Sequence, residues 1–139
     1  MTQLYATTGD DVVLLDETAR GWRAEVLLRA VGAQCLAVDP SDERHLIVGT
    51  FDQGAFLSDD GGRTWSRAET LPATRVLSVA ISPSWRVGGR GVLFAGCEPS
   101  ALFWSEDGGR RWHEAVALRA LPSAPTWSFP PRPWTSHVR

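Results

Sequence analysis

The chain has 139 residues, of which 43% are hydrophobic and 22% are charged, a balance typical of a folded globular domain rather than a disordered segment. Its formal net charge is −2, so no excess of positive charge favours nucleic acid or an anionic membrane as a partner. The N-terminus has neither the basic nor the apolar stretch of a signal peptide, and no run approaches the ~18 apolar residues of a membrane helix. We therefore expect a cytoplasmic protein.

Residues 1–30 contain short apolar runs that predict β-strands. The runs "LYATT" and "VVLLDE" are rich in Val, Leu and Ala and are separated by Gly and Asp, whereas no helical period is sustained. Trp22 follows them as a tryptophan follows the corresponding runs of each later unit. This first unit lacks an opening strand, because residue 1 already stands close to its second strand.

Residues 31–74 and 75–118 form two further units, and each unit predicts four short strands. In the second unit we expect the strands at about 33–38, 46–50, 55–58 and 64–68. In the third unit we expect them at about 76–81, 91–96, 101–105 and 111–115. The third unit also has extra residues around "WRVGGRG", which are expected to lengthen a loop between strands. Residues 119–139 are expected to hold an inter-unit loop and the start of a fourth unit.

One polar phrase occurs twice, as "SDDGGRTW" and "SEDGGRRW", 47 positions apart (58 to 105). A fixed period of this size indicates repeat architecture. In each copy the serine and an aspartate can hydrogen-bond the backbone of a tight turn, glycine accepts a positive φ, and tryptophan buries an apolar ring. The residues with these roles are Ser58, Asp60, Gly62, Thr64 and Trp65, and in the second copy Ser105, Asp107, Gly109 and Trp112.

These residues resemble the S-x-D-x-G-x-T-W pattern of the Asp-box, or BNR repeat, which is found in sialidase-like and WD40/YVTN/BNR-like β-propellers, including those of bacteria. The second copy has Arg111 in place of Thr, and the unit that contains Trp22 has lost the motif. The resemblance implies an all-β fold, an incomplete β-propeller of about three blades, each blade a four-stranded antiparallel sheet of ~40–47 residues. It also implies that the Asp-boxes lie at the blade periphery, away from the ligand face.

The resemblance raises the question of glycoside hydrolysis. Sialidases use an arginine triad and a tyrosine nucleophile assisted by glutamate. The single tyrosine here, Tyr5, lies in an expected core strand, and the acidic pairs lie at predicted turns, where such residues are ordinarily solvated. His45, His113 and His137 lack metal-ligand spacing, and the two cysteines are expected to be small buried hydrophobes rather than disulfide or metal ligands. We therefore predict no catalytic residue, no metal and no cofactor.

In a propeller, the loops between second and third strands share one face with the links between blades. The candidate ligand-binding residues on that face are Asp52, Glu98, Trp127, Arg132, Trp134 and His137. In the long link of about 116–136, prolines hold the aromatic residues in an extended chain, which suits stacking on a sugar or anchoring a protein. The alternative is that these aromatic residues plug the channel mouth. Trp134→Ala separates the two hypotheses, because only a plug predicts a large fall in melting temperature.

Closed propellers have about 4–8 blades, so about three blades leave open edges that favour self-association. We favour the N-terminal part of a longer propeller; the alternative is that two chains pair head-to-tail into a closed six-bladed ring.

The preferred function is a non-catalytic Asp-box propeller fragment that acts as a scaffold for an unknown protein or carbohydrate ligand. The alternative is a fragment of a sialidase-like glycoside hydrolase whose catalytic residues lie mainly in the missing blades.

Overall fold

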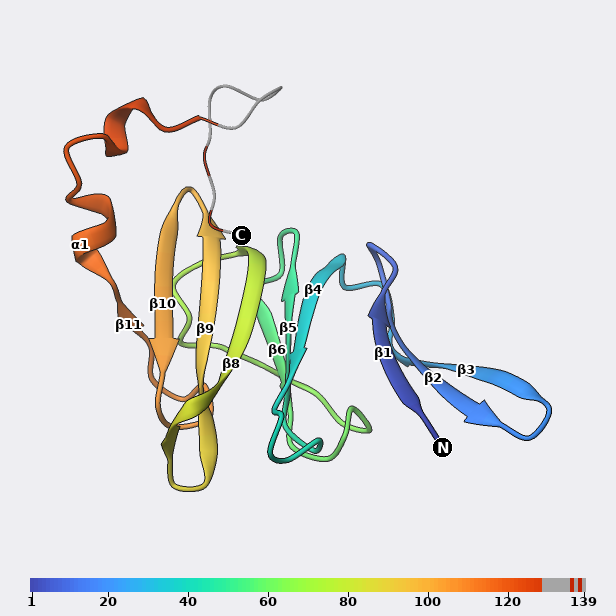
Figure 1. The fold of residues 1–139 in the computed structure, drawn as a ribbon. Helices are drawn as coiled ribbons and strands as arrows, with labels where there is room; N and C mark the ends of the chain where they lie inside the picture. The colour runs from blue at the N-terminus through green and yellow to red at the C-terminus, as the bar shows by residue number, and fades with distance from the viewer. Residues whose placement is uncertain (129–135, 137, 139) are drawn as a thin grey trace.

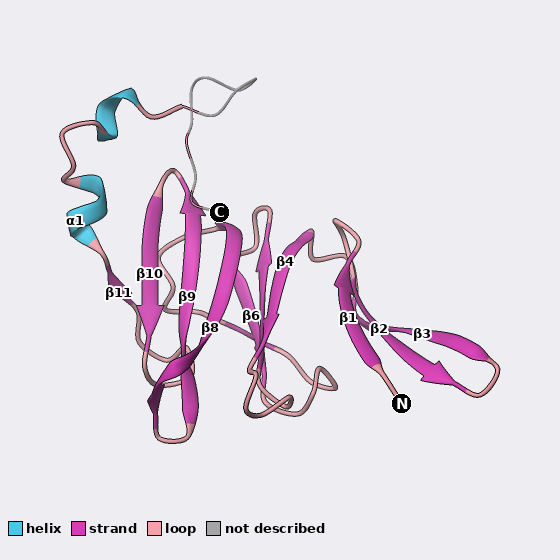
Figure 2. Ribbon diagram, in the orientation of Figure 1, coloured by secondary structure: helices cyan, strands magenta, loops and turns pink. Residues whose placement is uncertain are grey.

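The computed structural model describes residues 1–128, 136 and 138, and their strands form three antiparallel sheets that stand side by side (Figure 1). Sheet I contains β1 (Gln3–Thr7), β2 (Val12–Thr18) and β3 (Gly21–Leu28). Sheet II contains β4 (Ala33–Val38), β5 (Leu46–Thr50), β6 (Ala55–Ser58) and β7 (Ser66–Arg67). Sheet III contains β8 (Arg75–Val87), β9 (Arg90–Glu98), β10 (Ala101–Ser105) and β11 (His113–Glu114). In each sheet the strands pair in chain order, and the predicted all-β fold is confirmed (Figure 2).

Two apolar clusters join the three sheets, and β5 contributes to both. All five residues of β5 are buried. Val48 belongs to the cluster between sheets I and II, whereas Ile47 belongs to the cluster between sheets II and III. Successive side chains of a strand point to opposite faces, so a strand that is covered on both faces can be apolar throughout. This explains why "LIVGT" shows no alternation of polar and apolar residues.

Sheets II and III approach each other closely at Gly49 of β5. A Cβ atom added to this glycine would lie 2.5 Å from the Val76 carbonyl oxygen and 2.6 Å from Cys35 Sγ. A Cβ atom added to Gly96, at the matching position of sheet III, would lie 2.8 Å from Val138. Neither glycine is needed for an unusual φ; both allow a neighbouring backbone to approach the strand.

Some sequence predictions of local structure are wrong. The "WRVGGRG" segment was expected to be a loop, but β8 continues to Val87 and β9 begins at Arg90, so it extends a hairpin. Gly88 and Gly89 form its turn with φ values of 58° and 80°, the positive values that a tight hairpin turn requires. The strands β7 and β11 are only two residues long, because the loops of the repeated motif, 58–65 and 105–112, continue to their tryptophans. The long link also contains regular structure, helix α1 (Val116–Arg119) and a 3₁₀ turn (Ala124–Thr126).

Candidate functional site

The first copy of the repeated motif, residues 58–65, forms a loop that is closed by its own side chains. Ser58 is buried, and its Oγ donates a hydrogen bond to Asp60 Oδ1 at 2.9 Å and accepts one from Gly62 N at 2.8 Å. Asp60 also accepts hydrogen bonds from the backbone N–H and the hydroxyl of Thr64. Gly62 has a φ of 87°, and Trp65 Nε1 donates to its carbonyl oxygen at 2.8 Å. Every polar group named in the motif is therefore used within the loop.

The second copy of the motif, residues 105–112, repeats this geometry with one difference. Ser105 Oγ donates to Asp107 Oδ1 at 2.9 Å and accepts from Gly109 N at 2.9 Å, and Trp112 Nε1 donates to the Gly109 carbonyl oxygen at 3.1 Å. Arg111 stands where the first copy has threonine, and its backbone N–H still donates to Asp107 at 2.9 Å. The substitution removes the hydroxyl bond and keeps the backbone bond, so the loop closes in the same way.

The hydrogen bonds of these loops hold their aspartates in the charged form. The bonds from the Thr64 hydroxyl and backbone lower the pKa of Asp60 to about 2. Burial opposes ionisation of Asp107, but hydrogen bonds from the backbone of Arg111, from Ser105 and from the backbone of Arg110 leave its pKa below the usual value. A carboxylate that is already bonded to its own loop is poorly placed to accept a proton from a substrate. The geometry therefore suits a structural role for both loops.

At the other end of the strands, Arg75 joins two of the loops that were predicted to share a ligand face. Its Nη1 lies 3.0 Å from Glu98 Oε1, and its guanidinium carbon lies 4.8 Å from the centre of the Phe51 ring. Phe51 belongs to the β5–β6 loop and Glu98 ends β9, so the contact links sheets II and III. The ring and the guanidinium together fix the direction of the Glu98 carboxylate.

A groove of about 600 Å³ lies beside this carboxylate. Three segments distant in the sequence form it: the link before β8, the β9–β10 loop, and the segment from β11 into α1 (Figure 1). Its apolar surface comes from side chains such as Leu71 and Phe103, and its charged surface from Glu98, Glu114 and Arg119. Arg119 Nε donates to Glu114 Oε1, so each of the two carboxylates is held by an arginine. Thr74 and Ser100 add hydroxyl groups, which donate and accept hydrogen bonds.

The structure places the predicted ligand-face residues in different surroundings. Glu98 lines the groove, whereas Asp52 lies exposed in the β5–β6 loop and does not line it. Trp127 is half-buried after the 3₁₀ turn, where its Nε1 donates to Ser123 Oγ at 3.2 Å. The remaining three predicted residues lie outside the described residues: Arg132, Trp134 and His137. Sequence reasoning missed Glu114 and Arg119, because no local motif marks residues that meet only through the fold.

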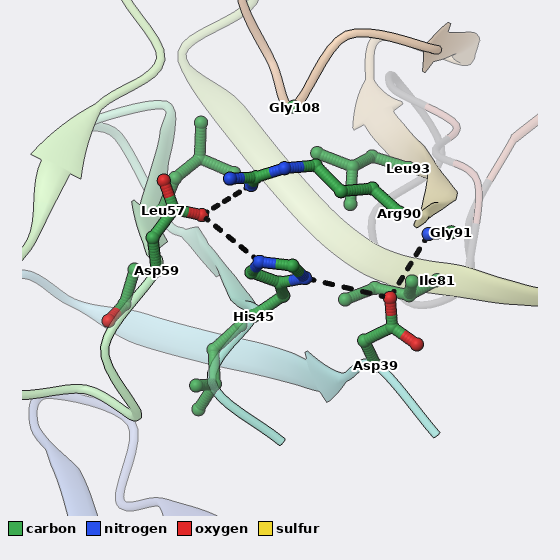
Figure 3. Close-up of a pocket in the computed structure, with 11 residues that line it drawn as sticks. Asp39, His45, Leu57, Asp59, Ile81, Arg90, Gly91, Leu93 and Gly108 are labelled. Atoms are coloured by element: carbon green, nitrogen blue, oxygen red, sulfur yellow. Dashed lines mark hydrogen bonds and ion pairs between the residues drawn. The ribbon is translucent and has the colours of Figure 1, made fainter. Parts of the chain in front are cut away.

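A second group of charged side chains lies between sheets II and III, at the end of the sheets that carries the two copies of the repeated motif (Figure 3). Asp39 is 1% exposed and accepts hydrogen bonds from Arg86 and from Gly91 N, which lower its pKa well below the usual range. His45 Nδ1 lies 3.8 Å from Asp39 Oδ2, and His45 Nε2 lies 3.9 Å from Asp59 Oδ1. The cavity among them holds about 20 Å³, room for roughly one water molecule. We therefore interpret this cluster as a polar link between sheets rather than as a ligand pocket.

Three general findings apply to the described part of the chain. Its His, Cys, Asp and Glu side chains form no group of three that could hold a metal ion. None of its helices is long and apolar enough to cross a membrane. Both cysteines are free thiols, and Cys97 is buried whereas Cys35 is half-buried.

Comparisons with known proteins support the propeller architecture. No family model matches the sequence. No curated protein matches it either. Among solved structures, the chain is similar to the GH74 xyloglucanase from Xanthomonas campestris, with a TM-score of 0.58 and 25% identity over 82% of this chain. The match covers 21% of the xyloglucanase chain, so this chain spans about a fifth of that protein's length. That enzyme is a β-propeller glycoside hydrolase, and the three sheets described here are consistent with propeller blades.

Proposed function

We propose that the chain is part of a β-propeller that recognises carbohydrate, and that the groove beside Glu98 is its binding site. The groove carries the proposal, because it combines apolar side chains with two carboxylates whose direction is set by arginines. Its volume of about 600 Å³ falls within the ~300–1,000 Å³ range of ligand pockets. The structural similarity to a glycoside hydrolase supports a carbohydrate ligand.

The chemistry of the lining suits a ligand with many hydroxyl groups. Carboxylates accept hydrogen bonds from hydroxyls, and hydroxyl side chains such as Ser100 can both donate and accept. The apolar face of a sugar ring can pack on the exposed proline next to Glu98. The proposed role is binding without catalysis, in which the groove orients a glycan and the Asp-box loops only hold the blades in shape.

The second candidate function is that of a glycoside hydrolase fragment, for which the similarity to a xyloglucanase is the specific observation. A sialidase-like mechanism would need a tyrosine nucleophile. The Tyr5 hydroxyl donates to the carbonyl oxygen of Gly61 at 3.3 Å and does not line the groove. A hydrolase would instead have to use a pair of carboxylates, and Glu98 and Glu114 are the two that line the groove.

The test is a titration of the 139-residue chain with xyloglucan-derived oligosaccharides, followed by tryptophan fluorescence and calorimetry. Glu98→Gln should weaken binding about tenfold, because it removes a charged acceptor. Asp52→Asn makes the same chemical change in the neighbouring loop, outside the groove, and should leave binding unchanged. Equal binding by both variants would contradict the proposed site.

The same samples distinguish the second candidate function. After incubation with the glycan, newly formed reducing ends would indicate hydrolysis. Glu98→Gln and Glu114→Gln should each abolish this activity if the two carboxylates act as a catalytic pair. Binding without any release of reducing ends would support the recognition function and exclude hydrolysis of the tested glycan by this chain.

A further inference from the structure

The outermost strand of sheet I differs from the outermost strands of the other two sheets. β3 has eight residues, whereas β7 and β11, which occupy the same place in sheets II and III, have two residues each. β3 pairs with β2 along one side, and among the described residues no strand pairs with its other side. Figure 1 shows the β2–β3 hairpin projecting from the row of sheets. The outer edge of β3 is therefore open to another strand.

An open edge of this length is a binding surface for an extended chain. The backbone N–H and C=O groups along the free side of a strand form hydrogen bonds with a strand that runs beside them. At about 3.3 Å per residue, β3 offers an edge of roughly 25 Å. Sheets I, II and III pack on one another through their faces. A further sheet of the same propeller would therefore cover a face of sheet I and leave the edge of β3 open.

The side chains of β3 are complementary to those of a second β3 strand that runs antiparallel to it. Arg23 and Glu25 have opposite charges and are two positions apart, so they lie on the same face of the sheet. In an antiparallel pair centred on Ala24, Arg23 of each copy lies opposite Glu25 of the other. On the other face, Trp22 of each copy lies opposite Val26 of the other. Opposite charges, and an aromatic ring beside a β-branched side chain, both stabilise the pairing of neighbouring strands.

The side chains that would form these pairs are accessible. The first five residues of β3 are exposed, and Trp22 is 54% exposed. The Arg23 side chain is 69% exposed, and its Nη2 donates to Asp16 Oδ2 of the neighbouring strand at 3.0 Å. This bond holds the guanidinium on the face that also carries Glu25. A guanidinium has five N–H donors, so Arg23 can bind a second carboxylate without losing the first.

We propose that β3 binds β3 of a second copy of this chain, edge to edge and antiparallel, about a two-fold axis beside Ala24. The two three-stranded sheets then form one continuous antiparallel sheet. The interface of a symmetric dimer must be complementary to itself. The β3 edge meets this condition, because the pair of Arg23 with Glu25 and the pair of Trp22 with Val26 each occur twice across the axis.

The test measures the mass of the chain in solution by sedimentation and light scattering over a range of concentrations. Wild type should reach twice the monomer mass of 15.2 kDa as the concentration rises. Arg23→Glu places two carboxylates opposite each other in both charge pairs, and Glu25→Arg places two guanidiniums there, so each variant alone should have the monomer mass. An equimolar mixture of the two variants should regain the dimer mass, because each charge pair of the mixed dimer again joins a carboxylate to a guanidinium.

Arg110→Glu and Glu69→Arg are the matched controls, since they make the same charge changes at exposed residues outside sheet I and should leave the dimer intact. Far-UV circular dichroism checks that every variant is folded. If Arg23→Glu fails to fold because it loses Asp16, Glu25→Arg decides alone, since it keeps that bond. A wild type that is monomeric at every concentration overturns the proposal. A dimer that survives in either single variant, or a mixture of folded variants that stays monomeric, also overturns it.

Discussion

The link between sheets II and III at Asp39 gives a prediction whose magnitude follows from the contacts. Asp39→Ala removes a carboxylate that is 1% exposed and that accepts hydrogen bonds from Arg86 Nη1 at 2.9 Å and Nη2 at 3.0 Å. It also removes the acceptor of the backbone N–H groups of Gly91 and Ser41. Arg86 lies on β8 and Gly91 on β9, so the substitution loosens the attachment of sheet II to both strands.

Loss of one partner of a buried ion pair costs about 3–5 kcal/mol. The Arg86 side chain is 23% exposed and can regain contact with water when Asp39 is lost, so we expect the lower end, about 3 kcal/mol of unfolding free energy. For a chain of this length that corresponds to a fall in melting temperature of about 10 °C. Urea denaturation followed by the fluorescence of the seven tryptophans measures the change directly.

Asp42→Ala is the matched control, because the half-buried Asp42 pairs with the exposed Arg44 of its own turn and joins no two sheets, and pairs with an exposed partner contribute little. The pH dependence gives a second check. The hydrogen bonds from Arg86 lower the pKa of Asp39 in the folded state, so its stabilising effect is complete above the unfolded pKa of about 3.9 and is lost at lower pH. The wild type and Asp39→Ala should therefore converge as the pH falls below about 4. A cost below about 1 kcal/mol at neutral pH would refute the reasoning.

Three further substitutions or treatments test the packing and the loops. Gly49→Ala should destabilise the chain by roughly 1–3 kcal/mol, measured by urea denaturation, because the added Cβ would lie 2.5 Å from the Val76 carbonyl oxygen. Burial raises the pKa of Cys35 to about 11 and of Cys97 to about 12, so Ellman's reagent at mildly alkaline pH should label both thiols only after unfolding. Asp60→Asn should lower the denaturation midpoint at neutral pH, and the difference from wild type should vanish as the pH falls toward the Asp60 pKa of about 2.

Each of these expectations has a clear contrary result. An unchanged midpoint for Gly49→Ala would mean that sheets II and III can separate at β5 without cost. Rapid labelling of either thiol in the folded chain would show that its environment opens on the time scale of the reaction. A difference between Asp60→Asn and wild type that is independent of pH would show that the charge of Asp60 does not stabilise its loop.

The strands of sheets II and III could be predicted from the sequence because their signals are local. The predicted ranges 33–38, 46–50, 55–58 and 101–105 coincide with β4, β5, β6 and β10. The bonds that shape each loop of the repeated motif join residues no more than four positions apart, so the motif is visible in a single line of sequence. The hairpin around "WRVGGRG" was missed, because its two glycines suggest a loop equally well as the tight turn that they form.

The candidate site was only partly predictable, for a physical reason. Glu98 was identified because it follows a strand in the repeat, whereas Glu114 and Arg119 reach the groove only when three separate segments come together. Likewise Asp39 and Arg86 are 47 positions apart, and no spacing along the chain links them.

By itself, therefore, the sequence determined the repeat, most of the strands and the loops of the repeated motif, which depend on neighbouring residues. The tertiary structure alone decided which side chains meet between blades, since packing of one sheet on the next brings together residues that no local pattern connects.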